Sequence, residues 1–145
     1  MPPSVTWSKE RIESFRVKVA AVVLASNIPN AHATSHGYFE VRPSDVAGRT
    51  DILLIDVREE SDLLGPDGHI HGVRHIPLKD VRAFVESRKD KSSPVVLVCQ
   101  NGRASATLAT SLARDFPQQQ VVVLVGGMTR WLAEERPVAR TKTYS

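Results

Sequence analysis

Three short apolar runs, separated by longer amphipathic stretches, constrain the fold of this chain most strongly. Residues 52–57, 94–99 and 121–125 read I-L-L-I-D-V, P-V-V-L-V-C and V-V-V-L-V. Their length and β-branched content indicate strands, and their continuous apolar character indicates burial on both faces. Strands of this kind, alternating with helices, require crossover connections and a mostly parallel sheet that helices cover on both sides. We therefore expect an α/β fold.

The stretches around these runs have the apolar spacing of helices. Residues 78–89, 103–116 and 129–135 each place apolar side chains on one helical face. Two shorter runs, at 38–41 and 73–76, are predicted as additional strands. The sequence therefore predicts a central, mostly parallel sheet of about five strands, with helices on both faces.

The length and composition fit one globular domain. The chain has 145 residues, of which 41% are hydrophobic and 24% charged, and this balance excludes a largely disordered or collagen-like protein. Its apolar runs fall short of the roughly 18 residues that a membrane-spanning helix needs. The 19 Lys and Arg residues are scattered along the chain and face 16 Asp and Glu residues. The net charge of +3 therefore predicts a solvated surface, with no binding to nucleic acid or membrane.

The first part of the chain, residues 1–35, is predicted to be a helical extension and a linker. Residues 8–26 have an apolar stripe at helical spacing, and residues 30–37 have the composition of a linker. The apolar part of this helix resembles a secretory signal, but acidic residues precede it, which favours the amphipathic helix. We expect residues 36–140 to form the domain and residues 141–145 a tail, in a cytoplasmic protein.

The single cysteine, Cys99, limits the chemistry that this chain can perform. One cysteine cannot form an intramolecular disulfide, and it excludes the zinc sites that need two or more thiolates. His69, His71 and His75 lie close together in sequence, but no cysteine or carboxylate joins them in a recognisable ligand pattern. We therefore predict no metal site and no cofactor.

The position of Cys99 favours a nucleophile. Free cysteines are most often small buried apolar residues, but this one ends a predicted strand, and the loop Q-N-G-R-A-S then leads into a predicted helix. Ligands bind beyond the carboxyl ends of the strands in a parallel sheet. Backbone N–H groups and the positive end of the helix dipole favour an anion there, and therefore a thiolate.

Four segments, in order, resemble the signature of rhodanese domains. Residues 56–58 (D-V-R) and 68–77 (G-H-I-H-G-V-R-H-I-P) are similar to its D-V-R and G-H-I-x-G-A-x-x-I-P elements. Residues 99–105 (C-Q-N-G-R-A-S) resemble its active-site loop, C-x-x-G-x-x-S, and residues 126–138 resemble its closing G-G-x-x-x-W…P-V segment. The resemblance covers about residues 38–140 and implies a rhodanese-like three-layer fold.

The resemblance also implies a sulfurtransferase with Cys99 as its catalytic residue. Cys99 would take a sulfane sulfur from a small donor anion such as thiosulfate, become a persulfide, and pass the sulfur to an external thiol or to cyanide. Asp56 and His69 are expected to be structural residues near the site, and Arg58 either adds positive potential there or pairs with Asp56. The expected substrate-binding residues are Gln100, Asn101, Gly102, Arg103, Ala104, Ser105 and Arg58.

The active-site loop of this chain departs from the family pattern at one position. Ala104 stands where many family members have arginine, and the arginine lies one place earlier, at Arg103, which bears on the choice of donor.

Two alternative functions are considered beside the sulfurtransferase. Rhodanese-fold phosphatases place an arginine six positions after the cysteine, where this chain has Ser105. A second hypothesis is a non-catalytic module that binds or regulates a partner protein, with residues 8–26 serving for docking or for a homodimer. The presence of Cys99 favours the enzyme.

Overall fold

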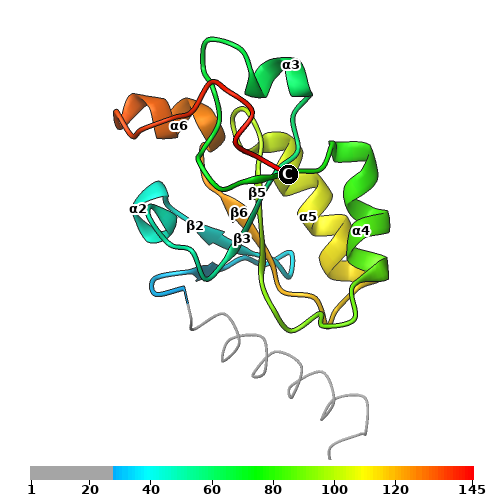
Figure 1. Cartoon of the computed structure of the whole chain (residues 1–145). Coiled ribbons are helices and arrows are strands. Elements are labelled where there is room, and N and C mark those ends of the chain that lie inside the picture. The colour runs from blue at the N-terminus through cyan, green and yellow to red at the C-terminus, as the bar shows by residue number, and fades with distance from the viewer. Residues whose placement is uncertain (1–27) are drawn as a thin grey trace, which may run out of the picture.

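The computed structural model describes residues 28–145, and the predicted helix at 8–26 lies outside the described residues. Six strands form one sheet in the order β1-β2-β6-β5-β3-β4 (Figure 1). The strands are β1 (His32–Ala33), β2 (Phe39–Val41), β3 (Leu53–Asp56), β4 (Arg74–His75), β5 (Val95–Val98) and β6 (Val121–Leu124). The helices are α2 (Pro43–Val46), α3 (Glu60–Leu63), α4 (Val81–Ser87), α5 (Arg103–Asp115) and α6 (Gly127–Ala133), with a 3-10 turn η1 (Leu78–Asp80) before α4.

The sheet is parallel from β2 to β4, as the sequence predicts, and all five predicted strands are present. The sixth strand, β1, pairs antiparallel with β2. The prediction of a linker over residues 30–37 is therefore wrong at His32–Ala33. A strand of two exposed residues at the edge of a sheet has no apolar run or alternation by which a sequence could reveal it.

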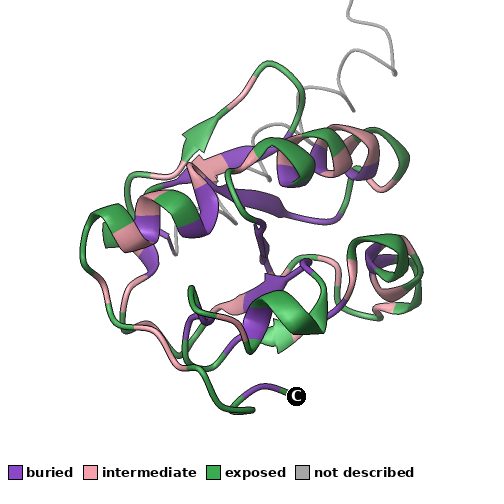
Figure 2. Cartoon of the chain, turned by 90° about the horizontal axis from the view of Figure 1, so that it is seen from above, coloured by how far each residue is buried: buried purple, intermediate pink, exposed green. Residues whose placement is uncertain are grey.

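Two apolar cores lie on the two faces of the sheet because successive residues of a strand point to opposite faces. In β5, Val96 and Val98 belong to one core, while Val95 and Leu97 belong to the other, together with Cys99. Figure 1 shows α4 and α5 on one side of the sheet and α2 and α6 on the other. Figure 2 shows the buried residues gathered on the strands and on the helix sides that face them. This is the three-layer architecture that the sequence predicts.

The helices differ from the predicted ones mainly at their ends. The predicted helix at 78–89 is divided into η1 and α4, and the predicted helix at 129–135 begins two residues earlier, at Gly127. Helices α2 and α3 were not predicted because four residues are too few for a helical period to appear in the sequence. Over residues 28–145, no helix has the length and apolar character that crossing a membrane requires.

The topology places Cys99 at a point where the direction of the strand order changes, which is called a topological switch point. β5 lies between β3 and β6, and the chain reaches it only after passing through β4 at the far edge. Because β3, β5 and β6 are parallel neighbours, the loops that follow them lie at the same end of the sheet, beyond the carboxyl ends of the strands. This is the place where parallel sheets bind their ligands.

Candidate active site

The sulfur of Cys99 faces two backbone N–H donors. Its Sγ accepts hydrogen bonds from the amide of Gly102, at 3.1 Å, and from the amide of Ser105, at 3.4 Å. Cys99 is 3% exposed, so that the charge of an anionic sulfur would be balanced by these donors rather than by bulk water. Hydrogen bonds to a charged acceptor are stronger than those to a neutral one, so the loop is suited to hold a thiolate.

Gly102 gives the loop the turn that directs these amides toward the sulfur. It has a φ of 91° and is the N-cap of α5, in the left-handed conformation that other residues rarely adopt. A Cβ at this position would also lie 3.1 Å from the amide nitrogen of Gly126. The first turn of α5 therefore presents N–H groups to Cys99, and the helix dipole adds positive potential.

Ser105, one of the two residues whose amides face the sulfur, also carries a hydroxyl without a partner among the described residues. Ser105 is 0% exposed, and its Oγ is one of four buried side-chain atoms that bond to nothing among residues 28–145. A buried polar atom without a partner costs free energy and requires an explanation. The amide of the same residue contacts Cys99 Sγ, so the unpaired hydroxyl belongs to a residue of the loop that faces the sulfur.

The start of α6 holds the other side of the loop. The amide of Met128 donates to the carbonyl of Cys99 at 2.9 Å, and the amide of Thr129 donates to the carbonyl of Gln100 at 2.8 Å. Gly127 makes this approach possible, because an added Cβ would overlap the carbonyl oxygen of Cys99. The two loops that follow β5 and β6 are therefore joined through their backbones.

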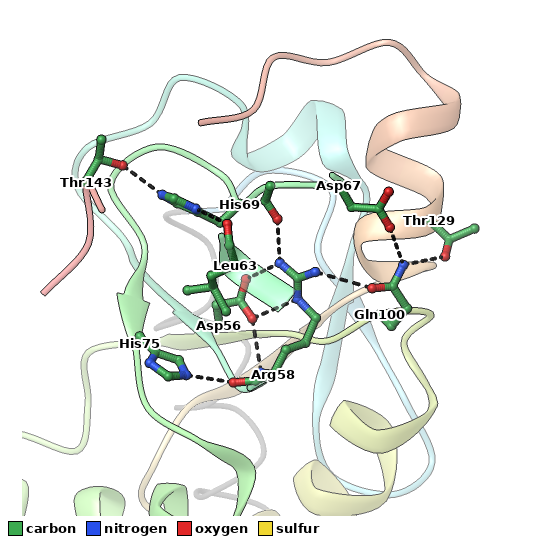
Figure 3. A network of polar contacts seen from close by, with 10 residues as sticks. Asp56, Arg58, Leu63, Asp67, His69, His75, Gln100, Thr129 and Thr143 are labelled. Atoms are coloured by element: carbon green, nitrogen blue, oxygen red, sulfur yellow. Dashed lines mark hydrogen bonds and ion pairs between the residues drawn. The ribbon is translucent and has the colours of Figure 1, made fainter. Parts of the chain in front are cut away.

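Arg58 forms a buried ion pair at the carboxyl end of β3 (Figure 3). Its guanidinium donates to the two carboxylate oxygens of Asp56, at 3.0 and 2.9 Å, and to the carbonyl of Gly68, at 2.8 Å. The Asp56 side chain is fully buried and that of Arg58 is 5% exposed. Of the two roles that the sequence left open for Arg58, this geometry corresponds to the ion pair.

Gln100, the residue after Cys99, connects the loop to three neighbouring segments (Figure 3). Its Oε1 accepts from Arg58 Nη1 at 3.3 Å. Its Nε2 donates to the Asp67 carboxylate at 3.4 Å and to the Thr129 hydroxyl at 3.3 Å. The side chain of Gln100 is thus engaged with protein groups on both sides of the loop.

Asp67 and Thr129 contact the side chain of Gln100 in the loop, although neither is among the site residues predicted from the sequence. Asp67 immediately precedes the segment 68–77, and Thr129 lies within 126–138, which both resemble the family signature. Their position beside those segments is the signal that could have found them.

His69 is fully buried and joins two segments of the chain. Its Nδ1 lies 2.8 Å from the carbonyl oxygen of Leu63, and its Nε2 lies 2.8 Å from the hydroxyl of Thr143 (Figure 3). A carbonyl oxygen only accepts, so Nδ1 carries the proton, and in the neutral ring Nε2 accepts from Thr143. His69 therefore has a structural place close to the site, and no set of three or more metal-ligating side chains occurs within residues 28–145.

Three loop residues, Asn101, Arg103 and Ala104, are exposed. The amide of Arg103 donates to the side-chain oxygen of Asn101 at 3.0 Å, so this amide is turned to a neighbour and not to the sulfur. Within the described part of the chain, the guanidinium of Arg103 pairs with no carboxylate. Arg103 is therefore the loop cation that is free to meet an anion from solvent.

These groups together suit the transfer of a sulfur atom. The Cys99 sulfur lies under two N–H donors, the Ser105 hydroxyl has no partner among the described residues, and the exposed Arg103 belongs to the same loop. A thiolate that its surroundings stabilise attacks without a general base. The site therefore contains what a nucleophilic exchange at sulfur requires of the protein.

Comparison with known proteins bears on this interpretation. The family model for the rhodanese-like domain matches residues 43–134. An uncharacterized protein of Bacillus subtilis, YqhL, is 40% identical over 86 residues, which are 59% of this chain and 64% of that protein. The matched segment thus spans less than two thirds of that relative.

Two further proteins are similar to part of the chain. The thiosulfate sulfurtransferase GlpE of Coxiella burnetii is 27% identical over 89 residues, covering 61% of this chain and 79% of that protein. The crystal structure of a rhodanese-related protein from Thermoplasma volcanium covers 70% of this chain and 98% of that one, with a TM-score of 0.60 and 22% identity. The structural similarity supports the fold alone.

Proposed function

Because the chain belongs to the rhodanese-like domain family, we propose that it is a sulfurtransferase that works through a persulfide on Cys99. The observation that carries this proposal is the pair of amides, from Gly102 and Ser105, that donate to Cys99 Sγ. A buried sulfur with two N–H donors, and with no carboxylate partner among the described residues, supports the role of a nucleophile.

In the first half-reaction, the Cys99 thiolate attacks the outer sulfur of a donor such as thiosulfate. A new S–S bond forms at Cys99, the S–S bond of thiosulfate breaks, and sulfite leaves with the electron pair. The negative charge passes to the outer sulfur of the persulfide, so charge and atoms balance without an added oxidant. The unused Ser105 hydroxyl and the Arg103 guanidinium are the groups available to the donor's oxygens.

In the second half-reaction, an external nucleophile takes the sulfur. Cyanide or a thiolate attacks the outer sulfur, the persulfide S–S bond breaks, and the electron pair returns to Cys99 as a thiolate. Since the chain has no second cysteine, its persulfide cannot be resolved internally. We propose that the acceptor is a small thiol or a protein thiol of a reducing, cytoplasmic environment, where free thiols are maintained.

A mass measurement tests the proposal directly. The protein is incubated with thiosulfate, freed of excess reagent, and its intact mass is determined. Wild type should gain the mass of one sulfur atom and should lose it again on addition of cyanide, with release of thiocyanate. Cys99→Ser should gain nothing, and a gain in that variant would place the sulfur elsewhere.

The same measurement separates the enzyme from a non-catalytic module. A module that only binds a partner would keep its mass unchanged with thiosulfate and also with a low-molecular-weight persulfide as donor. If thiosulfate fails and the persulfide succeeds, the chemistry stands and the donor class changes. Ala104, in place of the arginine that many family members carry, makes that comparison necessary.

A further inference from the structure

The C-terminal residues 141–145 fold back onto the loop that supports the active site, although they lie beyond the segment that matches the family. In Figure 1 this red segment returns from α6 toward the region of α3. The Thr143 hydroxyl reaches buried His69, and the carbonyl of Ser145 accepts from the amide of His75 at 3.0 Å. Tyr144 is 9% exposed and belongs to the core on the side of α3 and α6.

The Tyr144 ring packs against two histidines at once. It meets His69 edge-on with ring centroids 5.0 Å apart, and His75 with centroids 5.7 Å apart. Its hydroxyl donates to the Glu60 carboxylate at 2.9 Å. Burial, together with the hydrogen bond and negative charge of Glu60, raises the pKa of Tyr144, so that the hydroxyl stays a donor.

Each of these histidines leads to Arg58. His75 Nε2 lies 2.7 Å from the carbonyl oxygen of Arg58, and His69 follows Gly68, whose carbonyl accepts from the Arg58 guanidinium. Arg58 in turn donates to the side chain of Gln100, the residue after Cys99. Figure 3 shows this path from Thr143 through His69 and Arg58 to Gln100.

We propose that Thr143 and Tyr144 are positioning residues for the Cys99 loop and that they act through the two histidines and Arg58. Without the Thr143 hydroxyl, a nitrogen of the His69 ring is left buried and unpaired, which favours a shift of the ring and of the adjacent Gly68 carbonyl. Arg58 and Gln100 then lose a fixed neighbour. The amides that face the sulfur are thereby held less firmly.

The matched test substitutions are Thr143→Val and Thr141→Val. Both remove one hydroxyl from an exposed residue of the same tail, but of the two hydroxyls only that of Thr143 contacts His69 among the described residues. Tyr144→Phe is a milder second variant, because it removes only the hydroxyl that bonds to Glu60. Hydrogen–deuterium exchange of the peptide containing residues 99–105 reports how firmly the loop is held, and alkylation of Cys99 at neutral pH reports the reactivity of its sulfur.

In Thr143→Val we expect faster exchange in the loop peptide and slower alkylation of Cys99, with Thr141→Val unchanged in both. For sulfur transfer from thiosulfate we expect kcat to fall about tenfold, less than the roughly hundredfold cost of displacing reacting groups by 1 Å. KM should change little, because the exposed Arg103 is untouched. Tyr144→Phe should show the same effects in smaller size.

A tail with a merely local structural role gives a different result. Exchange would then rise only in the tail and in the segment it covers, while alkylation and kcat stayed at the wild-type values, and this outcome overturns the inference. The consequence for kcat rests on the proposed function, but exchange and alkylation do not. If wild type takes up no sulfur, the proposed function fails, and the positioning of the loop is still decided by those two measurements.

Discussion

The guanidinium of Arg58 lies 3.3 Å from the side-chain oxygen of Gln100, although the two residues are 42 positions apart in the chain. This contact links the carboxyl end of β3 to the residue that follows Cys99. It joins a buried ion pair, which is part of the folded core, to the loop that carries Cys99. The stability of the Asp56–Arg58 ion pair and the geometry of the Cys99 loop are therefore coupled.

Replacing Arg58 by methionine should destabilise the protein strongly. The Asp56 carboxylate is fully buried, and Arg58 is its ion-pair partner among residues 28–145, so the substitution leaves its charge without that cation. Breaking a buried ion pair from one side costs about 3–5 kcal/mol. Urea unfolding monitored by circular dichroism measures the loss of free energy of unfolding.

The double variant Asp56→Asn, Arg58→Met is the control for that result. It removes both charges, so it should recover part of the stability that Arg58→Met loses. If the double variant is no more stable than the single one, the unpaired charge of Asp56 is not the cause. Sulfur uptake should stay low in both variants, because both lose the contact from Arg58 to Gln100.

Gln100→Met should affect the reaction more than the stability. The three hydrogen bonds of the Gln100 side chain are long and partly exposed, so their loss should cost no more than about 1.5 kcal/mol. The loop, however, loses its ties to Arg58, Asp67 and Thr129, and sulfur uptake should slow about tenfold. Intact-mass measurements at timed intervals follow the uptake, and urea unfolding follows the stability.

Gln118→Met is the matched control because Gln118 is exposed and precedes β6. It therefore lies near the amino ends of the parallel strands, whereas Cys99 lies at their carboxyl ends. It should leave sulfur uptake unchanged. Equal slowing in the two variants would mean that the substitution acts through general stability and not through the loop.

The sequence revealed those features of the site that depend on neighbours along the chain. Cys99 stands at a strand end, Gly102 follows three residues later, and the next residues form a helix, so their geometry is largely local. The apolar runs that form β3, β5 and β6 likewise signal buried strands by themselves. These features therefore needed no knowledge of the tertiary fold.

Other features depend on residues that only the fold brings together. Tyr144 bonds to Glu60 across 84 positions of sequence, and nothing near either residue indicates the other. The free hydroxyl of Ser105 is defined by the lack of a partner among the described residues, which no local pattern can express. The sequence predicts Gln100 only as a substrate-binding residue of the loop, and its bonds to Arg58 and Asp67 appear only in the fold.

Ser105→Ala should separate stability from activity. The Ser105 hydroxyl has no partner within residues 28–145, so its removal breaks no hydrogen bond of the described fold and relieves a buried polar atom. We expect a free energy of unfolding within about 1 kcal/mol of wild type. The rate of sulfite release should fall about tenfold, since the donor loses one hydrogen bond, which contributes up to about 1.5 kcal/mol net. A parallel loss of stability and rate would show that the hydroxyl serves the fold.

The free energy of unfolding should fall at acidic pH, in part because Glu134 becomes protonated. Hydrogen bonds from Arg136 and Arg130 hold the pKa of Glu134 below its usual value. A carboxylate with a lowered pKa in the folded state stabilises the protein above its unfolded pKa, about 4.3, and this stabilisation disappears as the pH falls through the folded value. Urea midpoints measured across the acidic range should therefore fall less steeply for Glu134→Gln than for wild type. High salt should narrow the difference, because these groups are exposed.

Gly127→Ala should harm both the fold and the site, because two separate costs act at that position. The residue has a φ of 53°, and an added Cβ would press against the carbonyl of Cys99, which accepts from the Met128 amide. Gly48→Ala is the matched control, since Gly48 has a φ of 73° but nothing within 4 Å of an added Cβ. The free energy of unfolding of the control should fall only by about 1–2 kcal/mol, which is the cost of the left-handed conformation for alanine. Its Cys99 should be alkylated at the wild-type rate. Gly127→Ala should lose more than that in urea unfolding, and Cys99 should be alkylated at a different rate. Identical behaviour of the two variants would contradict the idea that the start of α6 fixes the position of Cys99.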